Sequence, residues 1–384
     1  MNYSFRKDND WILIITTFLL AAFGLVMVFS ASYVKGLSLA DVNDPYFFVK
    51  RQFMWFCIAS FFFLLIMHIP YRFYQKLSPY IIVMAIISLI MVLIPGLGAT
   101  VNGAQRWIDF GPLRVQPSEF VKIGMIIYLA QVYSQKQAYI DQFIKGVLPP
   151  LVVVAIVFGL IMRQPDLGTA TSILLVTLLI VFFSGAKLRH LVGLGLVGST
   201  LFMLLAVTEP YRLRRLVSFL DPFADANGSG LQLVQAYIAM ANGGLSGTGL
   251  GQSIQKLFYL PEPHTDFILA IVSEELGIFG VLFVIVAYMV IIFRGVMIGT
   301  KCKSPFGSLL AFGIVFQIAI QVLFNVGAVT GMLPITGIPL PLVSNGGSSL
   351  FITFVSLAIL ANISRNTIRQ KRLKENMDEM QLSA

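Results

Sequence analysis

The stretch Lys256–Gly277, KLFYLPEPHTDFILAIVSEELG, joins a polar loop to a long apolar run. Its two prolines hold the approach extended, because proline fixes φ and restricts the residue before it. His264, Thr265 and Asp266 come next, and the apolar run FILAIV begins directly after Asp266. A carboxylate at the mouth of a membrane helix costs free energy unless it has a partner or a function. Asp266 is therefore the first candidate for a functional residue.

The composition of the whole chain places this stretch in a membrane protein. Of its 384 residues, 57% are hydrophobic and 12% are charged, and the mean hydropathy is +0.84. Long apolar runs recur along the whole length, which excludes a soluble globular class and indicates a polytopic helical protein. The net charge of +9 fits the basic cytoplasmic loops of such a protein, so it does not require a nucleic-acid partner.

The apolar runs predict an all-α protein, a single integral membrane domain over residues 1–384 with ten membrane-spanning helices. Ten is an even number, so both termini lie on one side. More than half of the 27 Lys and Arg residues fall in one alternate set of segments, which includes Arg6 and Lys7, and this predicts cytoplasmic termini. The predicted spans are 11–32, 49–69, 79–97, 118–134, 147–162, 168–184, 188–207, 267–293, 306–331 and 347–364.

The predicted outer loop at 208–266 is the one large segment outside the membrane. Residues 211–220 have the pattern of an interfacial amphipathic helix, and residues 232–241 predict a second short helix. Residues 242–251, NGGLSGTGLG, are too rich in glycine for a regular element, so we expect a loop whose backbone approaches another segment closely. The charged tail at 366–384 is predicted to be a disordered cytoplasmic segment.

The remaining basic residues lie on the predicted outer side or at outer helix ends, and they include Arg51, Arg106 and Lys122. A cationic outer face opposes the topological bias and suggests an anionic ligand, although such side chains also extend to lipid headgroups. Glu119 stands three residues before Lys122, on the same helical face, so a purely structural ion pair is an alternative for these two.

Other polar residues at predicted helix starts have two readings. Ser118 is a candidate N-cap. Asp166, in the short loop RQPDLG, could cap the sixth span or point into a cavity shared with Asp266. The last outer loop ends in NGGSS, with Ser348 and Ser349 at the start of the tenth span. Glycines before a helix N-terminus could form an anion site, and a re-entrant loop that needs small residues explains them equally well.

Several motifs together resemble one family, the SEDS proteins (shape, elongation, division and sporulation). They are NGAQRWI, VQPSEFVK, RQPDLGT, GLSGTGLGQSIQKLFYLPEPHTDFILAIVSEELG and LPLVSNGGSSL. The resemblance covers essentially the whole chain. The stretch QKLFYLPEP is more similar to the FtsW-type branch, which serves division and sporulation, than to RodA.

The resemblance implies a peptidoglycan glycosyltransferase of the bacterial cytoplasmic membrane that acts in cell division. Its substrate would be lipid II, a disaccharide-pentapeptide on undecaprenyl pyrophosphate, polymerised at the outer face. Its partners would be a class B penicillin-binding protein and other membrane proteins of the divisome. In the family the essential aspartate matches Asp266, while Arg51, Arg106 and Lys122 match cavity residues and Asp166 lies close. The last loop departs from the pattern at Thr336, where some relatives carry Lys, and at Asn345, where Tyr is commoner, so the role of this loop is in question.

The residues fit this chemistry independently of the resemblance to the family. Asp266 could act as the general base for the acceptor hydroxyl, and Arg or Lys side chains could stabilise the leaving pyrophosphate. A divalent cation, Mg²⁺ or Mn²⁺, could bind Asp266 or Asp166, and no organic cofactor is expected. A supporting position close to the reacting groups is expected for His264, Thr265 and Glu274. The predicted substrate-binding set is Arg51, Arg106, Lys122, Asp166, Glu119, Ser348 and Ser349.

Two other functional classes compete with this reading. A lipid II flippase would also need a charged cavity in a helical bundle, but transporters carry their charges at the membrane midplane and often in paired repeats. Here the charges gather at predicted outer helix ends, and no repeat is visible. A non-catalytic scaffold that recruits a division enzyme would leave Asp266 and the outer arginines unexplained.

Overall fold

The structure is a computed structural model, and it describes residues 8–38, 43–101, 103–111, 113–208 and 210–382. Arg6, Lys7 and Asn102, as well as the side chain of Arg212, lie outside the described part. The α-helices are α2 (Trp11–Ser38), α3 (Phe47–Ile66), α4 (Arg72–Leu93), α5 (Pro117–Gln135), α6 (Leu148–Arg163), α7 (Leu167–Phe183), α8 (Leu188–Thr208), α9 (Pro210–Leu220), α10 (Leu231–Gly243), α11 (Ile268–Lys301), α12 (Pro305–Val329) and α13 (Gly347–Leu382).

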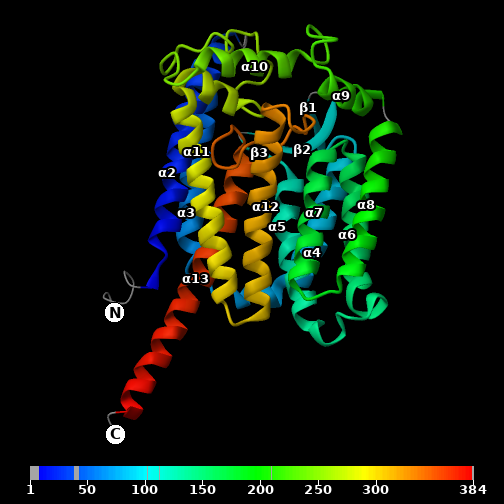
Figure 1. Cartoon of the computed structure of the whole chain (residues 1–384), viewed down its shortest axis with the longest axis vertical. Helices are drawn as coiled ribbons and strands as arrows, with labels where there is room; N and C mark the ends of the chain where they lie inside the picture. Colours follow the sequence, from blue (N-terminus) through cyan, green and yellow to red (C-terminus); the bar gives the residue numbers. More distant parts are fainter. Residues whose placement is uncertain (1–7, 39–42, 102, 112, 209, 383–384) are drawn as a thin grey trace.

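The long helices form an upright bundle, with the start and the end of the chain at the same end (Figure 1). A helix occupies each of the ten predicted spans, but the described part contains seven that are long and apolar enough to cross a membrane: α2, α3, α4, Phe143–Arg163, α11, α12 and α13. The apolar stretches of α7 and α8, Leu167–Phe183 and Leu188–Leu204, are shorter than these seven helices. Helix α5 carries the charged residues Glu119 and Lys122. The protein is therefore a multi-pass membrane protein, and the number ten stays a prediction.

A small sheet corrects the all-α expectation. Strands β1 (Gly98–Val101), β2 (Ala104–Phe110) and β3 (Leu113–Val115) form an antiparallel meander between α4 and α5. Gly103 and Gly111 have φ of +76° and +77°, so glycine supplies the left-handed backbone that both tight turns need. The pairing sets Trp107 opposite Ala99 and Ile108 opposite Val115. This sheet places Arg106 at the same end of the bundle as Asp266.

The C-terminal tail is helical, which differs from the disorder predicted for 366–384. The tail continues α13 as a helix to Leu382 and extends away from the bundle (Figure 1), where disorder was predicted. Residues 365–382 contain no Gly or Pro, and Lys, Glu, Met and Gln are good helix formers. Ion pairs support the helix, since Arg372 contacts Asp8 at 2.5 Å and Lys371 contacts Glu375 at 3.5 Å.

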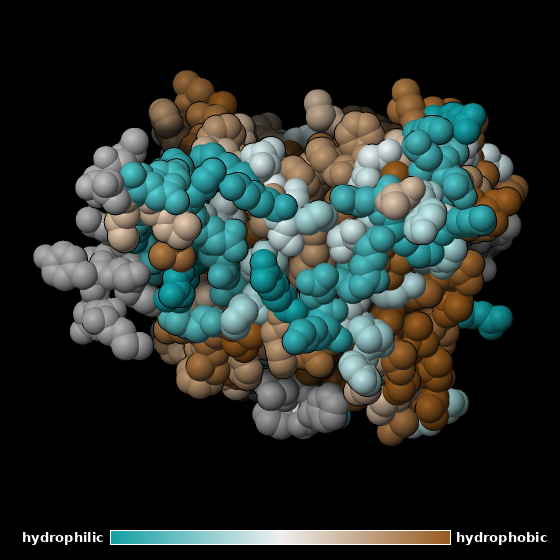
Figure 2. All heavy atoms as spheres, turned by 90° about the horizontal axis from the view of Figure 1, so that it is seen from below, coloured by the Kyte–Doolittle hydropathy of each residue, from teal (hydrophilic) through white to brown (hydrophobic). Residues whose placement is uncertain are grey.

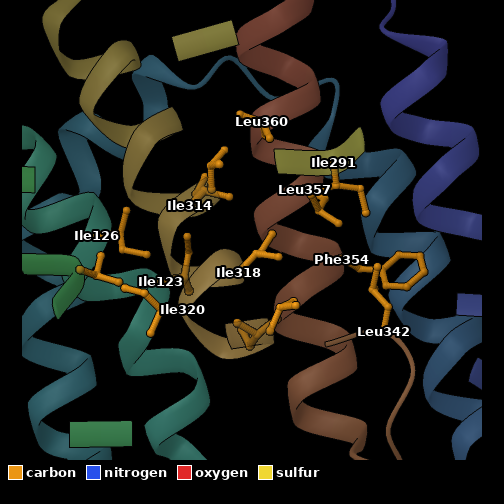
Figure 3. Close-up of a cluster of buried hydrophobic side chains, with 14 of the residues drawn as sticks. Ile123, Ile126, Ile291, Ile314, Ile318, Ile320, Leu342, Phe354, Leu357 and Leu360 are labelled. Carbon is orange, nitrogen blue, oxygen red and sulfur yellow. The ribbon is translucent and has the colours of Figure 1, made fainter. Parts of the chain in front are cut away.

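Helix α12 is at the centre of the bundle, packed against α5, α7 and α11. Lipid tails are as apolar as leucine, so close packing rather than the hydrophobic effect holds such helices together. Gly295 and Gly313 allow this, because an added Cβ would lie 2.1 Å from Val315 and 2.5 Å from Ile126. The cluster in Figure 3 joins α5, α11, α12 and α13 through Ile123, Ile126, Ile291, Ile314, Ile318, Ile320, Phe354, Leu357 and Leu360.

The two ends of the helical bundle differ in the residues and elements at their surfaces. Seen from the end that carries the C-terminal helix (Figure 2), hydrophilic side chains gather across the face and hydrophobic side chains gather at its margins. At the opposite end, α9 and α10 lie across the helices (Figure 1). Helices are therefore present at 211–220 and 232–241 as predicted, and the interfacial position of the first stays a prediction.

The glycine-rich loop after α10 packs backbone to backbone against α11. The amides of Thr248 and Gly249 donate to the carbonyls of Glu274 and Glu275 at 2.9 and 3.0 Å. A Cβ on Gly247 would lie 2.2 Å from the carbonyl oxygen of Glu275, so only glycine fits. The predicted close approach is confirmed.

Candidate active site

A cavity of about 190 Å³ opens at the end of the bundle opposite the chain termini. Segments far apart in the sequence build its walls: β2, the start of α5, α7, the turn before α11, α12 and the loop before α13. Its lining residues are Arg106, Trp107, Gln116, Glu119, Lys122, Asp166, Thr169, Ser172, Thr265, Asp266, Gln321, Gly337, Ile338, Pro339, Asn345, Gly346 and Ser349. The cavity therefore combines two aspartates, one glutamate and two cationic side chains.

Asp266 lies in the turn directly before α11 and lines the cavity. Its carbonyl accepts a hydrogen bond of 2.8 Å from Asn325 Nδ2, which ties the turn to α12. Burial raises the pKa of the Asp266 carboxyl to about 6, while Arg215 and Arg106 lower this pKa and Glu262 and Asp166 raise it. A carboxyl group with this pKa is ionised at neutral pH and still able to hold a proton, as a general base requires.

Asp166 fulfils both of its predicted roles. Its Oδ1 accepts a hydrogen bond of 3.2 Å from Thr169 N and so caps α7. Its Oδ2 accepts a hydrogen bond of 3.4 Å from Gln116 Nε2, and the same carboxylate lines the cavity beside Asp266. A second negative charge thus lies close to the candidate base.

Arg106 is held in place by the loop before α7. Its Nε donates to the carbonyl of Gln164 at 2.9 Å, and its Nη2 donates to the carbonyl of Pro165. A guanidinium has five N–H donors, so these contacts fix its plane and leave donors for an anionic ligand in the cavity.

Lys122 and Glu119 form the predicted ion pair at the wall of the cavity. Lys122 Nζ lies 2.8 Å from Glu119 Oε1, and the side chains are 4% and 5% exposed. The prediction that Ser118 is the N-cap is wrong, because α5 begins at Pro117 with Gln116 in the capping position. The Ser118 hydroxyl instead accepts a hydrogen bond of 3.0 Å from Gln116 Nε2.

Four predicted site residues do not line the cavity. The guanidinium of Arg51 lies over the ring of Phe47, one turn earlier on α3, at 5.5 Å. Ser348 Oγ accepts a hydrogen bond of 3.0 Å from Gln116 N and thereby holds the start of α5. Ser349, the next residue, does line the cavity.

The other two residues outside the cavity are Glu274 and His264. Glu274 is fully buried and accepts hydrogen bonds from the backbone of Ile254 and Gln255, so it organises the loop behind α10. His264 is buried against Phe48, and burial together with the charge of Lys35 lowers the pKa of its imidazole to about 4, against an opposing effect of Glu262. The backbone carbonyl of His264, not its ring, supports the turn that carries Asp266, because it accepts a hydrogen bond of 2.9 Å from Asn345 N.

Sequence reasoning missed Gln116, Ser172 and Gln321 as lining residues. Ser172 and Gln321 interrupt apolar runs in α7 and α12, and a polar side chain inside a membrane helix is a signal of function. Gln116 carries no such signal, because it stands in a polar loop.

The fold and the site define a class: a multi-pass helical membrane protein with a charged cavity built by many helices at one end. Within this class, the family model described as "Cell cycle protein", of FtsW, RodA and SpoVE, matches residues 10–369. The chain belongs to this family, the SEDS proteins.

Curated relatives and solved structures agree with the family. The chain is 44% identical to stage V sporulation protein E of Bacillus subtilis, over 94% of this chain and 98% of the relative. It is also 44% identical to the probable peptidoglycan glycosyltransferase FtsW of that organism, over 93% and 91%. A solved structure described as "Structural coordination of polymerization and crosslinking by a peptidoglycan synthase complex" is similar with a TM-score of 0.76, 27% identity and coverage of 94% and 98%. The crystal structure of Thermus thermophilus RodA is similar with a TM-score of 0.69, 26% identity and coverage of 93% and 97%.

Proposed function

We propose that this protein is a peptidoglycan glycosyltransferase that polymerises lipid II at the outer face of the bacterial cytoplasmic membrane during cell division, with both termini in the cytoplasm. One observation carries the proposal: Asp266, with its raised pKa, and the cationic Arg106 line one cavity at the bundle end opposite the termini. Relatives named as probable peptidoglycan glycosyltransferases support the reaction class.

In the proposed reaction the acceptor hydroxyl oxygen attacks the anomeric carbon of the donor sugar. The bond from this carbon to the pyrophosphate oxygen breaks, and the pyrophosphate leaves with the electron pair. Asp266 accepts the hydroxyl proton. A single displacement inverts the α-linked donor to a β-linked product, so no carboxylate nucleophile is needed. Arg106 stabilises the negative charge on the leaving group.

The cationic side chains of the cavity do not contribute equally to binding the pyrophosphate. Lys122 is neutralised by Glu119 at 2.8 Å, whereas Arg106 donates to the uncharged carbonyls of Gln164 and Pro165. Arg215, on α9, donates to the carbonyl of Ile335 at 3.1 Å and lies close enough to Asp266 to lower its pKa. We therefore assign the larger share of pyrophosphate binding to Arg106.

Replacing Arg106 by Ala is expected to raise KM for lipid II and lower kcat/KM by about tenfold or more, because a charge-assisted contact contributes about 1.5–3 kcal/mol. The matched control is Arg369→Ala, which removes an exposed arginine from the tail of α13. Initial rates of polymer formation at several lipid II concentrations measure both. Equal losses in the two variants would argue against a cationic binding site in the cavity.

Turnover is expected to depend on pH with a midpoint near 6, since only the ionised Asp266 can accept a proton. The rate rises through pH 6 and is about tenfold below its plateau at pH 5. Arg215 lowers the pKa of Asp266, so Arg215→Ala should move the midpoint to higher pH. The profile of kcat/KM against pH for both proteins measures this, because it reports the pKa of the free enzyme, and a shift to lower pH would exclude the proposed electrostatics.

We also propose that a divalent cation, Mg²⁺ or Mn²⁺, assists the leaving group. Among the described residues no group of three or more His, Cys, Asp or Glu side chains could hold a metal, but Asp166 faces the cavity. Mg²⁺ is typically bound by one or two carboxylates together with substrate phosphates, so Asp166 and the pyrophosphate form a suitable pair. When bound, the ion would supply positive charge to the phosphate oxygens.

Chelation tests this assignment. Excess EDTA is expected to reduce polymer formation at least tenfold, and added Mn²⁺ or Mg²⁺ should restore it. Full turnover in EDTA would remove the cation from the scheme.

The cavity geometry favours transfer over lipid II transport. Below the main cavity, residues of α5, α12 and α13 enclose a second space of about 10 Å³, next to Lys122 and Gln317. This volume holds about one water molecule. A flippase would have to pass a disaccharide headgroup through this region, so in this conformation the bundle offers a site rather than a path.

We further propose that the enzyme works beside a class B penicillin-binding protein and other membrane proteins of the divisome. The similar solved structure that coordinates polymerization and crosslinking supports a crosslinking partner. Assays of the proposed activity should therefore contain the cognate partner.

A further inference from the structure

Asn325 is a buried asparagine of α12 with a side chain that joins two loops. It is 1% exposed, and its Nδ2 donates to the carbonyl of Asp266 at 2.8 Å and to the carbonyl of Ile338 at 2.9 Å. Both N–H groups of the amide are thus used. Asp266 and Ile338 lie on the cavity, whereas Asn325 does not line it.

The two loops that Asn325 joins also contact each other. Ser344 Oγ donates to the carbonyl of Thr265 at 2.6 Å and accepts from Leu340 N at 2.8 Å. Gln52 of α3 holds the far part of the last loop through Ser344 O and Gly346 N, both at 3.2 Å. The loops therefore form one unit, fixed to α12 by Asn325 and to α3 by Gln52.

This unit sets the surroundings of the candidate base. A Cβ on Gly337, whose φ is +71°, would lie 3.5 Å from Asp266 Oδ2, so the last loop passes close to the carboxylate. A shift of either loop would change the distance between the carboxylate and this wall. A misplacement of about 1 Å by a distant substitution can lower a rate about 10²-fold.

We propose that Asn325 is a positioning residue for glycosyl transfer, which holds the turn of Asp266 and the cavity wall at Ile338 in register from α12. The inference rests on the proposed function for its catalytic consequence, and on the two hydrogen bonds for its structural part. Asn325 itself touches neither substrate nor reacting atoms.

The substitution Asn325→Asp tests the proposal with little change of volume. It replaces the donor Nδ2 by an oxygen that faces two carbonyl oxygens, so both hydrogen bonds to the loops are lost or reduced to one. Asn325→Ser is the second variant, because its hydroxyl retains one donor and creates no repulsion.

Asn362 of α13 provides a matched control. It is 3% exposed, its Nδ2 donates to the carbonyl of Met67 at 2.8 Å, and its Oδ1 accepts from Tyr71 N at 2.9 Å. It thus joins the end of α3 to the start of α4, away from the cavity. Asn362→Asp removes a buried side-chain donor of one hydrogen bond, where Asn325→Asp removes a donor of two.

The values of kcat and KM, measured on the full chain with its partner, test the catalytic part of the proposal. For Asn325→Asp we expect kcat to fall about 10²-fold with KM within about threefold, and for Asn362→Asp we expect kcat within about threefold of wild type. Equal losses in both variants, or an unchanged kcat for Asn325→Asp, would overturn the catalytic role. If Asn325→Asp does not insert, Asn325→Ser is expected to show a smaller fall of the same kind.

Hydrogen exchange gives a measurement that does not depend on activity. The amides of Leu340 and Asn345, which bond within the loop unit, should exchange faster in Asn325→Asp and at the wild-type rate in Asn362→Asp. Unchanged exchange in Asn325→Asp would overturn the positioning role. A wild-type protein that makes no polymer would contradict the proposed function alone, because the exchange result would still decide whether Asn325 holds the loops.

Discussion

Replacing Asp266 by Asn is expected to reduce polymer formation from lipid II by about 10²–10⁴-fold, the usual contribution of a general base. Asparagine has the same shape and keeps the backbone contact with Asn325, which involves only the carbonyl of residue 266. The amide cannot accept the proton of the acceptor hydroxyl. The variant should therefore fold and insert normally, and rates with labelled lipid II measure the loss.

The comparison variant is Asp166→Asn, the same change at the neighbouring carboxylate, which is assigned to the proposed cation site and not to proton transfer. Asparagine is as good an N-cap as aspartate, so α7 keeps its cap and the loss should be smaller than for Asp266→Asn. Size-exclusion profiles and thermal unfolding of the variants establish that each is folded. Retained polymerisation by a pure Asp266→Asn sample would refute the assignment of the base.

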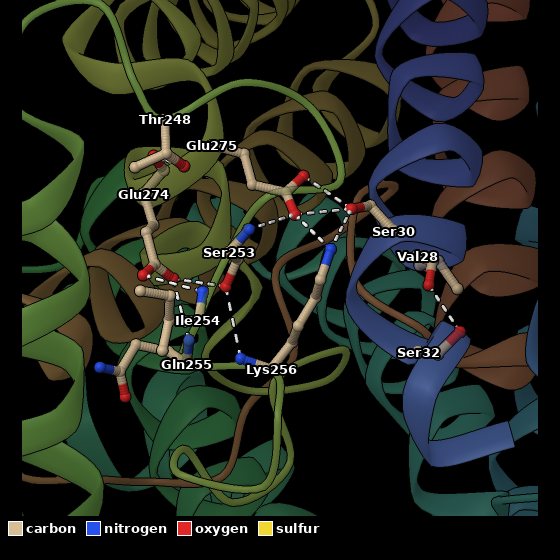
Figure 4. A network of polar contacts seen from close by, with 10 residues as sticks. All are labelled: Val28, Ser30, Ser32, Thr248, Ser253, Ile254, Gln255, Lys256, Glu274 and Glu275. Carbon is tan, nitrogen blue, oxygen red and sulfur yellow. Dashed lines mark hydrogen bonds and ion pairs between the residues drawn. The ribbon is translucent and has the colours of Figure 1, made fainter. Parts of the chain in front are cut away.

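Replacing Lys256 by Met is expected to destabilise the protein by about 3–5 kcal/mol, because it leaves the charge of Glu275 buried without its partner. Lys256 Nζ lies 2.8 Å from Glu275 Oε1, and the two side chains are 7% and 0% exposed. Ser30 of α2 donates to the same carboxylate, so the network joins α2, α11 and the segment around Lys256 that follows the glycine-rich loop (Figure 4). Removing both charges together, in Lys256→Met with Glu275→Leu, should restore much of the stability.

Lys35→Met is the control for this prediction. It breaks the ion pair with Glu262, at 2.9 Å, in which the side chains are 30% and 37% exposed. Solvent screens such a pair, so the expected loss is below about 1 kcal/mol. Unfolding in mixed micelles titrated with SDS compares the three variants. A loss for Lys256→Met as small as that for Lys35→Met would show that the buried pair does not hold the loop.

Residues whose role depends on local spacing could be predicted from the sequence. Glu119 and Lys122 are three residues apart on a helix, which brings the side chains together. Asp166 precedes a helix start, and its capping bond is a local interaction. Asp266 was found because a carboxylate at the start of an apolar run is costly.

Features that depend on contacts across the fold could not be predicted. The strands at 98–115 are short and carry no sustained alternation of apolar and polar residues, so the sequence pattern did not predict them. Arg51 has the right charge, but its helix directs the side chain over Phe47. Asn325 looks like a single polar residue in an apolar run, and its two partners lie 59 and 13 residues away in the chain.

The most direct test is polymer formation from labelled lipid II by purified wild-type and Asp266→Ala protein, with the cognate class B partner and Mg²⁺ or Mn²⁺ present. We expect glycan chains from the wild type and none from Asp266→Ala. Chains from both proteins would contradict the role of Asp266. An absence of chains from both, in a properly assembled complex, would contradict the transferase itself.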